Sequence, residues 1–384
     1  MTGLTPKERF ANHRAGIKDA WVVRETAVSR ENTTLLLDPV TPTRHLTKQP
    51  IPRQLSAMNS IPVLPRRAFL ARASAAAAAV SLVPFARRVS AQANPVRMPL
   101  CLSPGSIGVK ADQREAIALA AKHGFTAVEP FPQFLAGIDA TGRGELLADL
   151  KANKLTWGAA GLPVDFRGDD VRFEQDLADL PRLAAALQRC DVTRTGTWIS
   201  PGHNALEYAA NFERHRQRLA KVAQILKNHG LRLGLEYVGT PSARARSQHP
   251  FVYNLAGARA LIAAIGTGNV GLVLDSWHWW TAGDTEAALL ALRNEDVVAV
   301  DLNDAPTGLT LDQQQDGQRE LPATTGVIPV ATFLDALRRI GCDAPIRAEP
   351  FNKKLNAMEK DGACAATITA LRKAMALIDG VPGR

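Results

Sequence analysis

The chain has 384 residues, of which 46% are hydrophobic and 22% are charged, as in a globular protein large enough for one large domain or two smaller ones. Its formal net charge is +9, but residues 1–93 hold 14 of the 46 Lys and Arg and 5 of the 37 Asp and Glu, which leaves 32 of each sign from residue 94 onward. A neutral body argues against nucleic acid as a partner, because phosphate binding needs a local excess of basic residues.

The segment around Arg66 and Arg67 resembles a twin-arginine export signal. The pair lies in the run PRRAFL, an alanine-rich stretch follows over residues 73–84, and AQA at 91–93 has the small-x-small pattern of a signal peptidase site. We expect residues 58–93 to be the signal, Asn94 to begin the mature chain, and the protein to be periplasmic or secreted. A basic linker before a short helix is the alternative. The apolar run is too short to span a membrane, so we expect no stable membrane anchor.

Residues 1–57 precede this signal with Pro- and Thr-rich stretches and no sustained periodicity. A twin-arginine signal normally begins close to the N-terminus, so we expect Met58 to be the true start. Residues 1–57 are then either a disordered leader or the product of a misplaced start codon, and they do not enter the reasoning about fold.

From residue 97 onward, short apolar strands alternate with longer amphipathic helices, the pattern of βα units. Strands are predicted at residues 99–102, 127–130, 156–162, 194–200, 232–238, 271–278, 297–303 and 345–351. Helices are predicted at residues 112–122, 173–188, 212–229, 256–265, 285–293, 330–340 and 365–378. Eight units predict the α/β class and a (β/α)8 TIM barrel over residues 94–384 as a single catalytic domain. A doubly wound open sheet is the structural alternative, but no GxGxxG follows the first strand, so we expect no dinucleotide cofactor.

Three predicted strands end in a carboxylate: Glu236, Asp275 and Glu349. Side chains at the carboxyl ends of barrel strands converge on one mouth. A buried carboxylate without a partner costs several kcal/mol or becomes protonated, so three together are best explained by a bound cation. The alternative is that each caps the following helix or pairs with an arginine.

The segments LGLEYVG, GLVLDSWHWW, VAVDLNDAP, RELPATTG and IRAEPF resemble the xylose isomerase-like TIM barrels over nearly the whole mature chain. This superfamily includes sugar epimerases, hydroxypyruvate isomerases, inosose dehydratases and endonuclease IV. The resemblance implies Glu236, Asp275, Asp301 and Glu349 as metal ligands. Asp301 departs from the usual strand-seven His, and if it points elsewhere, Asn303 or water completes the shell. An all-oxygen shell favours Mn or Mg, with Co or Zn as further options.

The same resemblance implies substrate contacts close to Asp275. His278 matches the family's Asp-x-x-His, with a neutral buried histidine as the alternative. Trp277, with Trp279 and Trp280, is predicted to form an aromatic rim over the apolar face of a sugar, with packing between barrel and helices as the alternative.

Four further residues are predicted substrate contacts. Arg319 resembles the arginine that grips a substrate oxygen, with a solvated loop arginine as the alternative. Glu129 ends the second strand and so faces the mouth. His203 and His249 lie on loops after strands four and five, where histidines without function are common.

The resemblance implies a divalent-metal-dependent isomerase or epimerase acting on a ketose or related keto-sugar through an enediolate, with Glu236 and Glu349 exchanging the proton. The alternatives are a metal-dependent dehydratase or lyase of a keto-sugar or inosose, and a periplasmic sugar-binding barrel without turnover. An apurinic endonuclease is disfavoured because only His203, His249 and His278 fall near loops and the mature chain is neutral. The partner is therefore a small sugar or keto acid, and the family suggests a homo-oligomer. The four cysteines have no CxxC spacing and are expected to be buried small hydrophobes.

Overall fold

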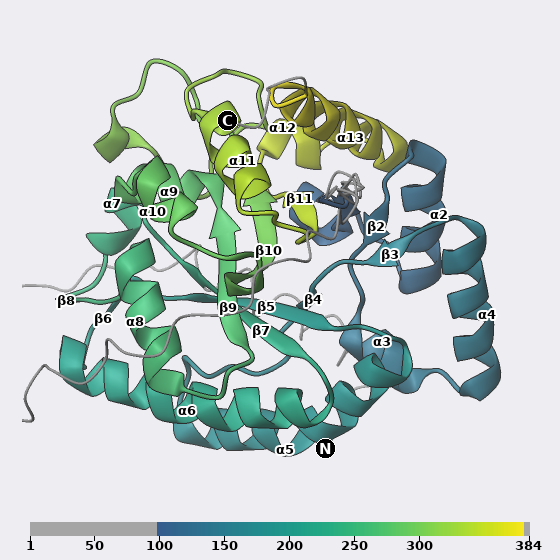
Figure 1. The fold of residues 1–384 in the computed structure, drawn as a ribbon, viewed down its shortest axis with the longest axis horizontal. Helices are drawn as coiled ribbons and strands as arrows, with labels where there is room; N and C mark the ends of the chain where they lie inside the picture. Colours follow the sequence, from purple (N-terminus) through teal and green to yellow (C-terminus); the bar gives the residue numbers. More distant parts are fainter. Residues whose placement is uncertain (1–97, 380–384) are drawn as a thin grey trace, which may run out of the picture. The chain divides into compact units, whose positions relative to one another are not determined.

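The computed structural model describes residues 98–379, which form a closed barrel of parallel strands surrounded by helices (Figure 1). The expected leader, export signal and mature start lie outside the described residues. The strands are β1 (Cys101–Leu102), β2 (Ala127–Val128), β3 (Thr156–Trp157), β4 (Ala160–Gly161), β5 (Arg194–Ile199), β7 (Arg232–Tyr237), β9 (Val270–Asp275), β10 (Val297–Leu302) and β11 (Ile346–Ala348). A separate antiparallel pair joins β6 (Gly202–His203) to β8 (His249–Pro250).

The strand order shows how the barrel closes. One sheet runs β1-β2-β3 and another runs β11-β10-β9-β7-β5-β4, all parallel. The third predicted strand is split, so that its first half, β3, pairs with β2 and its second half, β4, pairs with β5. A parallel bridge between Leu100 and Ile346 joins the first strand to the last, with the Ile346 N–H donating to the Pro99 carbonyl at 2.8 Å. The predicted TIM barrel is therefore confirmed.

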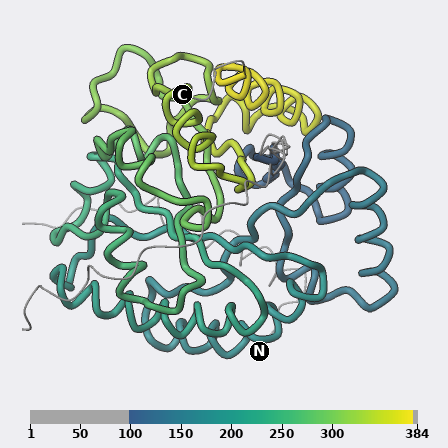
Figure 2. Tube along the Cα trace, in the orientation of Figure 1, coloured from purple at the N-terminus to yellow at the C-terminus, as the bar shows by residue number. Residues whose placement is uncertain are grey.

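Helices follow most strands and cover the barrel (Figure 2). They are α2 (Gln113–His123), α3 (Pro132–Gly137), α4 (Ala140–Ala152), α5 (Asp170–Arg189), α6 (Tyr208–Asn228), α7 (Pro241–Arg244), α8 (Leu255–Ile265), α9 (Ser276–Ala282), α10 (Glu286–Leu290), α11 (Val330–Arg339), α12 (Lys353–Asn356) and α13 (Lys360–Ala376), with 3₁₀ turns η2 (Pro104–Ile107), η3 (Asn294–Asp296) and η4 (Leu311–Gln313). Each of the seven predicted helices overlaps an observed one, whereas α3, α4 and the short helices α7, α9 and α12 were not predicted. No described helix is both long enough and apolar enough to cross a membrane.

Helix boundaries follow from local side chains. The Asp112 carboxylate accepts the Glu115 N–H at 2.9 Å and begins α2, and Asp169 begins α5 in the same way through the Arg172 N–H at 2.8 Å. Gly124 ends α2 at a φ of 74°, where a residue without Cβ is favoured. The predicted strand 271–278 is too long by three residues, because Asp275 caps α9 through the Trp277 N–H at 2.7 Å and turns the chain into a helix.

The pleat decides which strand residues face the barrel interior. Leu233 and Leu235 on β7 are buried hydrophobics of the main core, so the alternate positions Gly234 and Glu236 face the other side of the sheet. A Cβ at Gly234 would lie 2.7 Å from a methyl of Val273, which fills the interior from β9. Glu236 therefore comes at the end of an interior-facing row, as the sequence predicts.

The first and last helices of the described chain pack side by side, as Figure 1 shows for α2 and α13. Lys122 and Asp361 form an ion pair at 2.8 Å, and Lys360 pairs with Glu115 at 2.5 Å. All four cysteines are buried and form no disulfide, which confirms the prediction that they are buried.

Candidate functional site

Four acidic side chains converge inside the barrel at the carboxyl ends of its strands. Glu236 and Asp275 come from β7 and β9, Asp301 from β10, and Glu349 directly follows β11. One oxygen from each lies within 4.8 Å of the others, and Glu236, Asp275 and His278 form a second such group. Residues more than one hundred positions apart in the chain are thus brought together by the parallel register of the barrel.

The cluster holds more negative charge than its protein neighbours neutralise. Burial first, and then the carboxylates of Glu349, Asp301 and Asp275, raise the pKa of Glu236 well above its usual range. Burial also raises the pKa of Glu349, to about 7, against the opposing effect of Arg347. Glu236 Oε1 is buried and has no hydrogen-bond partner among residues 98–379. A buried carboxylate oxygen without a donor calls for a cation, and a set of carboxylate oxygens suits a divalent ion.

Arg319 neutralises one side of the cluster. Its Nη1 donates to Asp275 Oδ2 at 2.8 Å and lies 3.5 Å from Glu349 Oε2, while its Nη2 donates to Asp316 Oδ1 at 2.7 Å. The guanidinium carbon lies 4.7 Å from the centre of the Phe351 ring. Arg319, a predicted substrate contact, is therefore held in buried ion pairs, with only 2% of its surface exposed.

Arg347 occupies the opposite side. Its Nε donates to Asp301 Oδ1 at 2.6 Å and its Nη2 to Asp301 Oδ2 at 2.8 Å, a two-bond fork that engages both oxygens of the carboxylate. The same Nη2 donates to Glu349 Oε1 at 3.1 Å. Asp301 therefore lies within the cluster, as predicted, with both oxygens already bonded to an arginine. The alternatives to a bound cation were that the carboxylates cap helices or pair with arginines. Both are observed, since Asp275 caps α9 and Arg319 and Arg347 pair with the cluster, although the carboxylates also converge.

His278 lies in the first turn of α9, against the cluster. The Gly239 N–H donates to its Nδ1 at 3.2 Å, and its Nε2 lies 3.2 Å from Arg319 Nη2 and 3.6 Å from Asp316 Oδ1. Burial lowers the pKa of His278, although Asp316 and Asp275 oppose that effect. His278 is 2% exposed, so it is buried at the edge of the carboxylate cluster.

Trp277 packs inside the barrel wall. It is completely buried, and its Nε1 donates to the Thr240 hydroxyl at 2.8 Å. Trp279 packs against Phe333 with ring centres 5.4 Å apart, and only Trp280 is partly exposed. These contacts pack Trp277 and Trp279 between the barrel and its helices, which was the alternative to an aromatic rim over the substrate.

The other predicted contacts lie on the same side of the barrel but outside the carboxylate cluster. The Ser103 hydroxyl donates to Glu129 Oε2 at 2.5 Å, and Glu129 is partly exposed. His203 and His249 face each other across β6 and β8. His203 Nδ1 accepts the N–H groups of Ala205 and Leu206 at 3.0 and 2.8 Å, so it organises its own loop.

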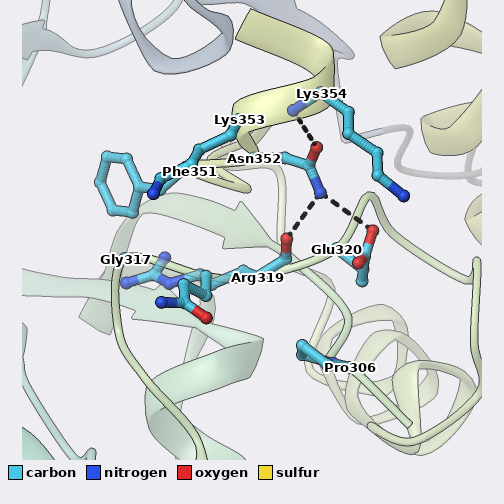
Figure 3. A pocket seen from close by; sticks show the side chains of 9 residues that line it. Pro306, Gly317, Arg319, Glu320, Phe351, Asn352, Lys353 and Lys354 are labelled. Atoms are coloured by element: carbon cyan, nitrogen blue, oxygen red, sulfur yellow. Dashed lines mark hydrogen bonds between the residues drawn. The ribbon is translucent and has the colours of Figure 1, made fainter.

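A hollow of about 280 Å³ adjoins the cluster and shares Arg319 with it (Figure 3). Phe351, Lys353 and Lys354 line it from the turn after β11. Figure 3 shows Asn352 joining this turn to the loop that carries Arg319: its Nδ2 donates to the Arg319 carbonyl and to Glu320 Oε2, each at 3.0 Å.

The profile of the xylose isomerase-like TIM barrel family matches residues 117–375. The chain belongs to this family. The crystal structure of a xylose isomerase domain protein from Alicyclobacillus acidocaldarius is 30% identical, with a TM-score of 0.65 over 74% of this chain and 100% of that one. Two more distant crystal structures share the fold, and each covers 74% of this chain and 100% of its own. One is the IOLI protein with a bound zinc atom, at 17% identity and a TM-score of 0.62. The other is D-psicose 3-epimerase with D-fructose, at 16% identity and a TM-score of 0.58.

Among curated proteins, the inosose isomerase of Bacillus velezensis is 29% identical over 136 residues, or 35% of this chain and 44% of the relative. The inosose isomerase of Bacillus subtilis is 28% identical over the same length, or 45% of that protein. The chain therefore matches less than half the length of these relatives.

Several further residues of this xylose isomerase-like barrel support the site, and of these only Asn303 was named from the sequence, as a substitute ligand. Asn303 donates to Asp275 Oδ1 and accepts the Glu349 N–H, each at 3.0 Å, so it links two carboxylate positions rather than offering a free oxygen. Asp316 and Asn352 lie on irregular loops and carry no sequence signal. Arg347 did have a sequence signal, because it lies two residues before Glu349 and side chains two apart lie on the same face of a strand.

Proposed function

We propose that this protein is a divalent-metal-dependent isomerase or epimerase of a ketose or related keto-sugar. The observation that carries the proposal is the convergence of Glu236, Asp275 and Glu349, in which Glu236 Oε1 is buried and has no protein donor among the described residues. Arg319 and Arg347 neutralise only part of the negative charge of the four carboxylates, and carboxylate oxygens in a buried site suit a divalent ion. Mn or Mg suits these oxygen donors best.

The proposed chemistry assigns proton transfer to Glu236 and Glu349. One carboxylate removes the proton from the carbon beside the carbonyl, and the other returns one to the adjacent carbon or to the opposite face of the same carbon. A divalent ion held by Glu236, Asp275 and Glu349 would stabilise the negative charge that develops on the substrate oxygens. Asp275, held by Asn303 and the Trp277 N–H, keeps its oxygens directed at the cluster.

Membership of the family and the partial matches to two inosose isomerases support this reaction class. Both isomerisation of a polyol ketone and epimerisation of a ketose begin with a proton removed next to a carbonyl. We propose the reaction class, with a ketose or a polyol ketone such as an inosose as the substrate.

Metal analysis and solvent exchange test it together. We expect about one Mn or Mg per chain by emission spectroscopy, and deuterium from D2O incorporated into a ketose or inosose substrate. Glu236→Gln should abolish exchange and lower the metal content, whereas Glu145→Gln, a change on the outer face of α4, should do neither. Failure to bind any divalent ion would refute the proposal.

A second candidate is a sugar-binding barrel without turnover. It is favoured by one observation, namely that both oxygens of Asp301, the position of the expected fourth ligand, are bonded to Arg347. Bound metal without exchange on any ketose or inosose tested would select this candidate. A dehydratase or lyase would instead show loss of water in the NMR spectrum of the product.

We also propose export by the twin-arginine route, on the strength of the PRRAFL run and the AQA site in the sequence. Replacing both arginines of that run with lysine should retain the protein in the cytoplasm. Cell fractionation tests this, and an unchanged periplasmic yield would contradict it.

A further inference from the structure

Arg347 and Asp301 form an ion pair inside the barrel, in the same layer as Asp275. The register pairs Asp301 with Arg347 on β11 and with Asp275 on β9. Asp301 has no exposed surface, and both of its oxygens accept hydrogen bonds from Arg347, at 2.6 and 2.8 Å. Such a fork is among the strongest charge-assisted arrangements in proteins.

This pairing sets Asp301 apart from Glu236 in particular. Glu236 Oε1 has no donor among residues 98–379, whereas Asp301 has none of its oxygens left for a new partner without losing a bond to Arg347. A divalent ion bound directly to Asp301 would also lie beside the Arg347 guanidinium, where like charges repel. Asp275 and Glu349 have the same kind of neighbour in Arg319.

Asp275 also has both oxygens bonded, one to the Trp277 N–H and Asn303 and the other to Arg319. The contacts of Glu349 to Arg347 and Arg319 are longer, at 3.1 and 3.5 Å. Glu236 and Glu349 are therefore the carboxylates that protein donors engage least.

Arg347 itself has a free side. Its Nε and Nη2 bond to Asp301 and Glu349, but its Nη1 donates to no residue in the part of the chain that the structure describes. Its side chain is 27% exposed, in contrast to the 1% of Arg319, which uses all three of its nitrogens on protein acceptors. Two N–H groups of a fixed guanidinium thus remain available next to Glu349.

We propose that Arg347, held in place by Asp301, contacts a negatively charged oxygen of the substrate, and that Asp301 is a positioning residue rather than a metal ligand. This inference rests on the proposed function and specifies its substrate chemistry. A preorganised guanidinium stabilises an oxyanion well because no reorientation is needed when the charge forms or arrives. The oxygen is either the carboxylate of a sugar acid or the oxygen that becomes charged when the proton leaves.

The test uses the full-length protein loaded with Mn, with binding measured by calorimetry. The variants are Arg347→Met, Arg347→Lys and Asp301→Asn. Arg338→Met is the matched control, because Arg338 is 29% exposed and pairs with one aspartate, Asp335, on α11. The probes are Mn itself, oxalate as a planar dianion, D-glucuronate as a sugar acid and D-fructose as a neutral ketose.

We expect Arg347→Met to weaken oxalate binding by about tenfold to hundredfold, the range for a lost hydrogen bond to a charged group. Mn affinity should stay within about threefold in Asp301→Asn, which can no longer hold the fork, and should not fall in Arg347→Met. Asp301→Asn should weaken oxalate binding, and Arg347→Lys should restore part of it relative to Arg347→Met. Arg338→Met should change neither affinity.

The two sources of the charged oxygen separate in the same experiment. Loss of D-glucuronate binding along with oxalate assigns a substrate carboxylate, whereas loss of oxalate binding alone, with D-glucuronate unaffected, assigns the oxygen charged during reaction. D-fructose affinity should change little in either case.

Two results would overturn the inference: a large fall in Mn affinity in Asp301→Asn, or unchanged oxalate affinity in folded Arg347→Met. Should Arg347→Met not fold, unchanged oxalate affinity in Asp301→Asn would have the same effect. The proposed function fails separately, through the absence of Mn binding in the unsubstituted protein.

Discussion

The long loop between β10 and α11 carries Arg319 and Asp316, and its shape depends on the Asp304 carboxylate. Asp304 is completely buried. Its Oδ1 accepts the N–H groups of Ala305 and Ile328 at 2.8 and 3.0 Å, and its Oδ2 those of Thr325 and Gly326 at 2.9 and 2.8 Å. Its backbone also pairs with Glu320 in both directions. One side chain thus satisfies four backbone donors at both ends of the loop.

Asp304→Ala removes the acceptor of all four donors. At a net value of about 1 kcal/mol for each bond, we expect unfolding to become easier by about 4 kcal/mol, near the upper end for single substitutions. Asp304→Asn keeps one acceptor oxygen but turns an NH2 group toward two N–H donors, so we expect a loss of about 2 kcal/mol. Asp312→Ala, an exposed change in the same loop, should stay within about 0.5 kcal/mol.

Equilibrium unfolding in urea measures the global effect, and amide hydrogen exchange over residues 325–328 reports local opening of the loop. The loop can open without unfolding the barrel, so both measurements are required. If Asp304→Ala left the unfolding free energy within 1 kcal/mol of its original value and the exchange protection unchanged, the reasoning about this carboxylate would be wrong.

Three further outcomes are expected. Burial lowers the pKa of His215 from 6.5 to about 4, so the stability it provides is present above pH 6.5 and is lost as the pH falls toward 4. His215→Gln should therefore reduce the difference in unfolding free energy between pH 7.5 and pH 5 by about 2 kcal/mol in urea titrations, and an unchanged difference would contradict the assignment. Gly239→Ala places a Cβ 2.4 Å from the His278 carbonyl oxygen and 2.8 Å from another backbone atom of α9, so we expect about 1 to 3 kcal/mol of destabilisation by thermal unfolding, whereas Gly137→Ala, with nothing within 4 Å, should be neutral. Mn at about one hundred times its dissociation constant should stabilise the protein by about 2.7 kcal/mol, measured as a rise in melting temperature over a series of Mn concentrations. Chelation should remove this gain, and Glu236→Gln should show none.

The sequence predicted the barrel because its signal is local. Each strand is a short apolar run before an amphipathic helix, and the eight runs recur at the spacing of βα units. Errors arose where two local signals competed. The apolar run through Trp277 and His278 reads as a continued strand, although Asp275 is a good helix cap and ends it.

The carboxylates could be predicted for the same reason. Glu236, Asp275 and Glu349 each end an apolar strand, and parallel strands bring their carboxyl ends to one edge of a sheet, so the barrel alone implies that they meet. The closeness of Asp301 follows from the family pattern on strand seven. The family pattern does not predict what Asp301 binds, because the choice between a cation and Arg347 depends on the register between β10 and β11.

By itself the sequence determined the alternation of strands and helices, the barrel, and which carboxylates end the strands, since these depend on residues close together in the chain. Only the tertiary structure decided how the charges pair. Arg347 bonds to Asp301 across β10 and β11, and Arg319 reaches Asp275 from a loop 44 residues away. Such pairs are fixed by strand register and loop path, which no local pattern encodes, and they decide which carboxylates are left to hold a cation.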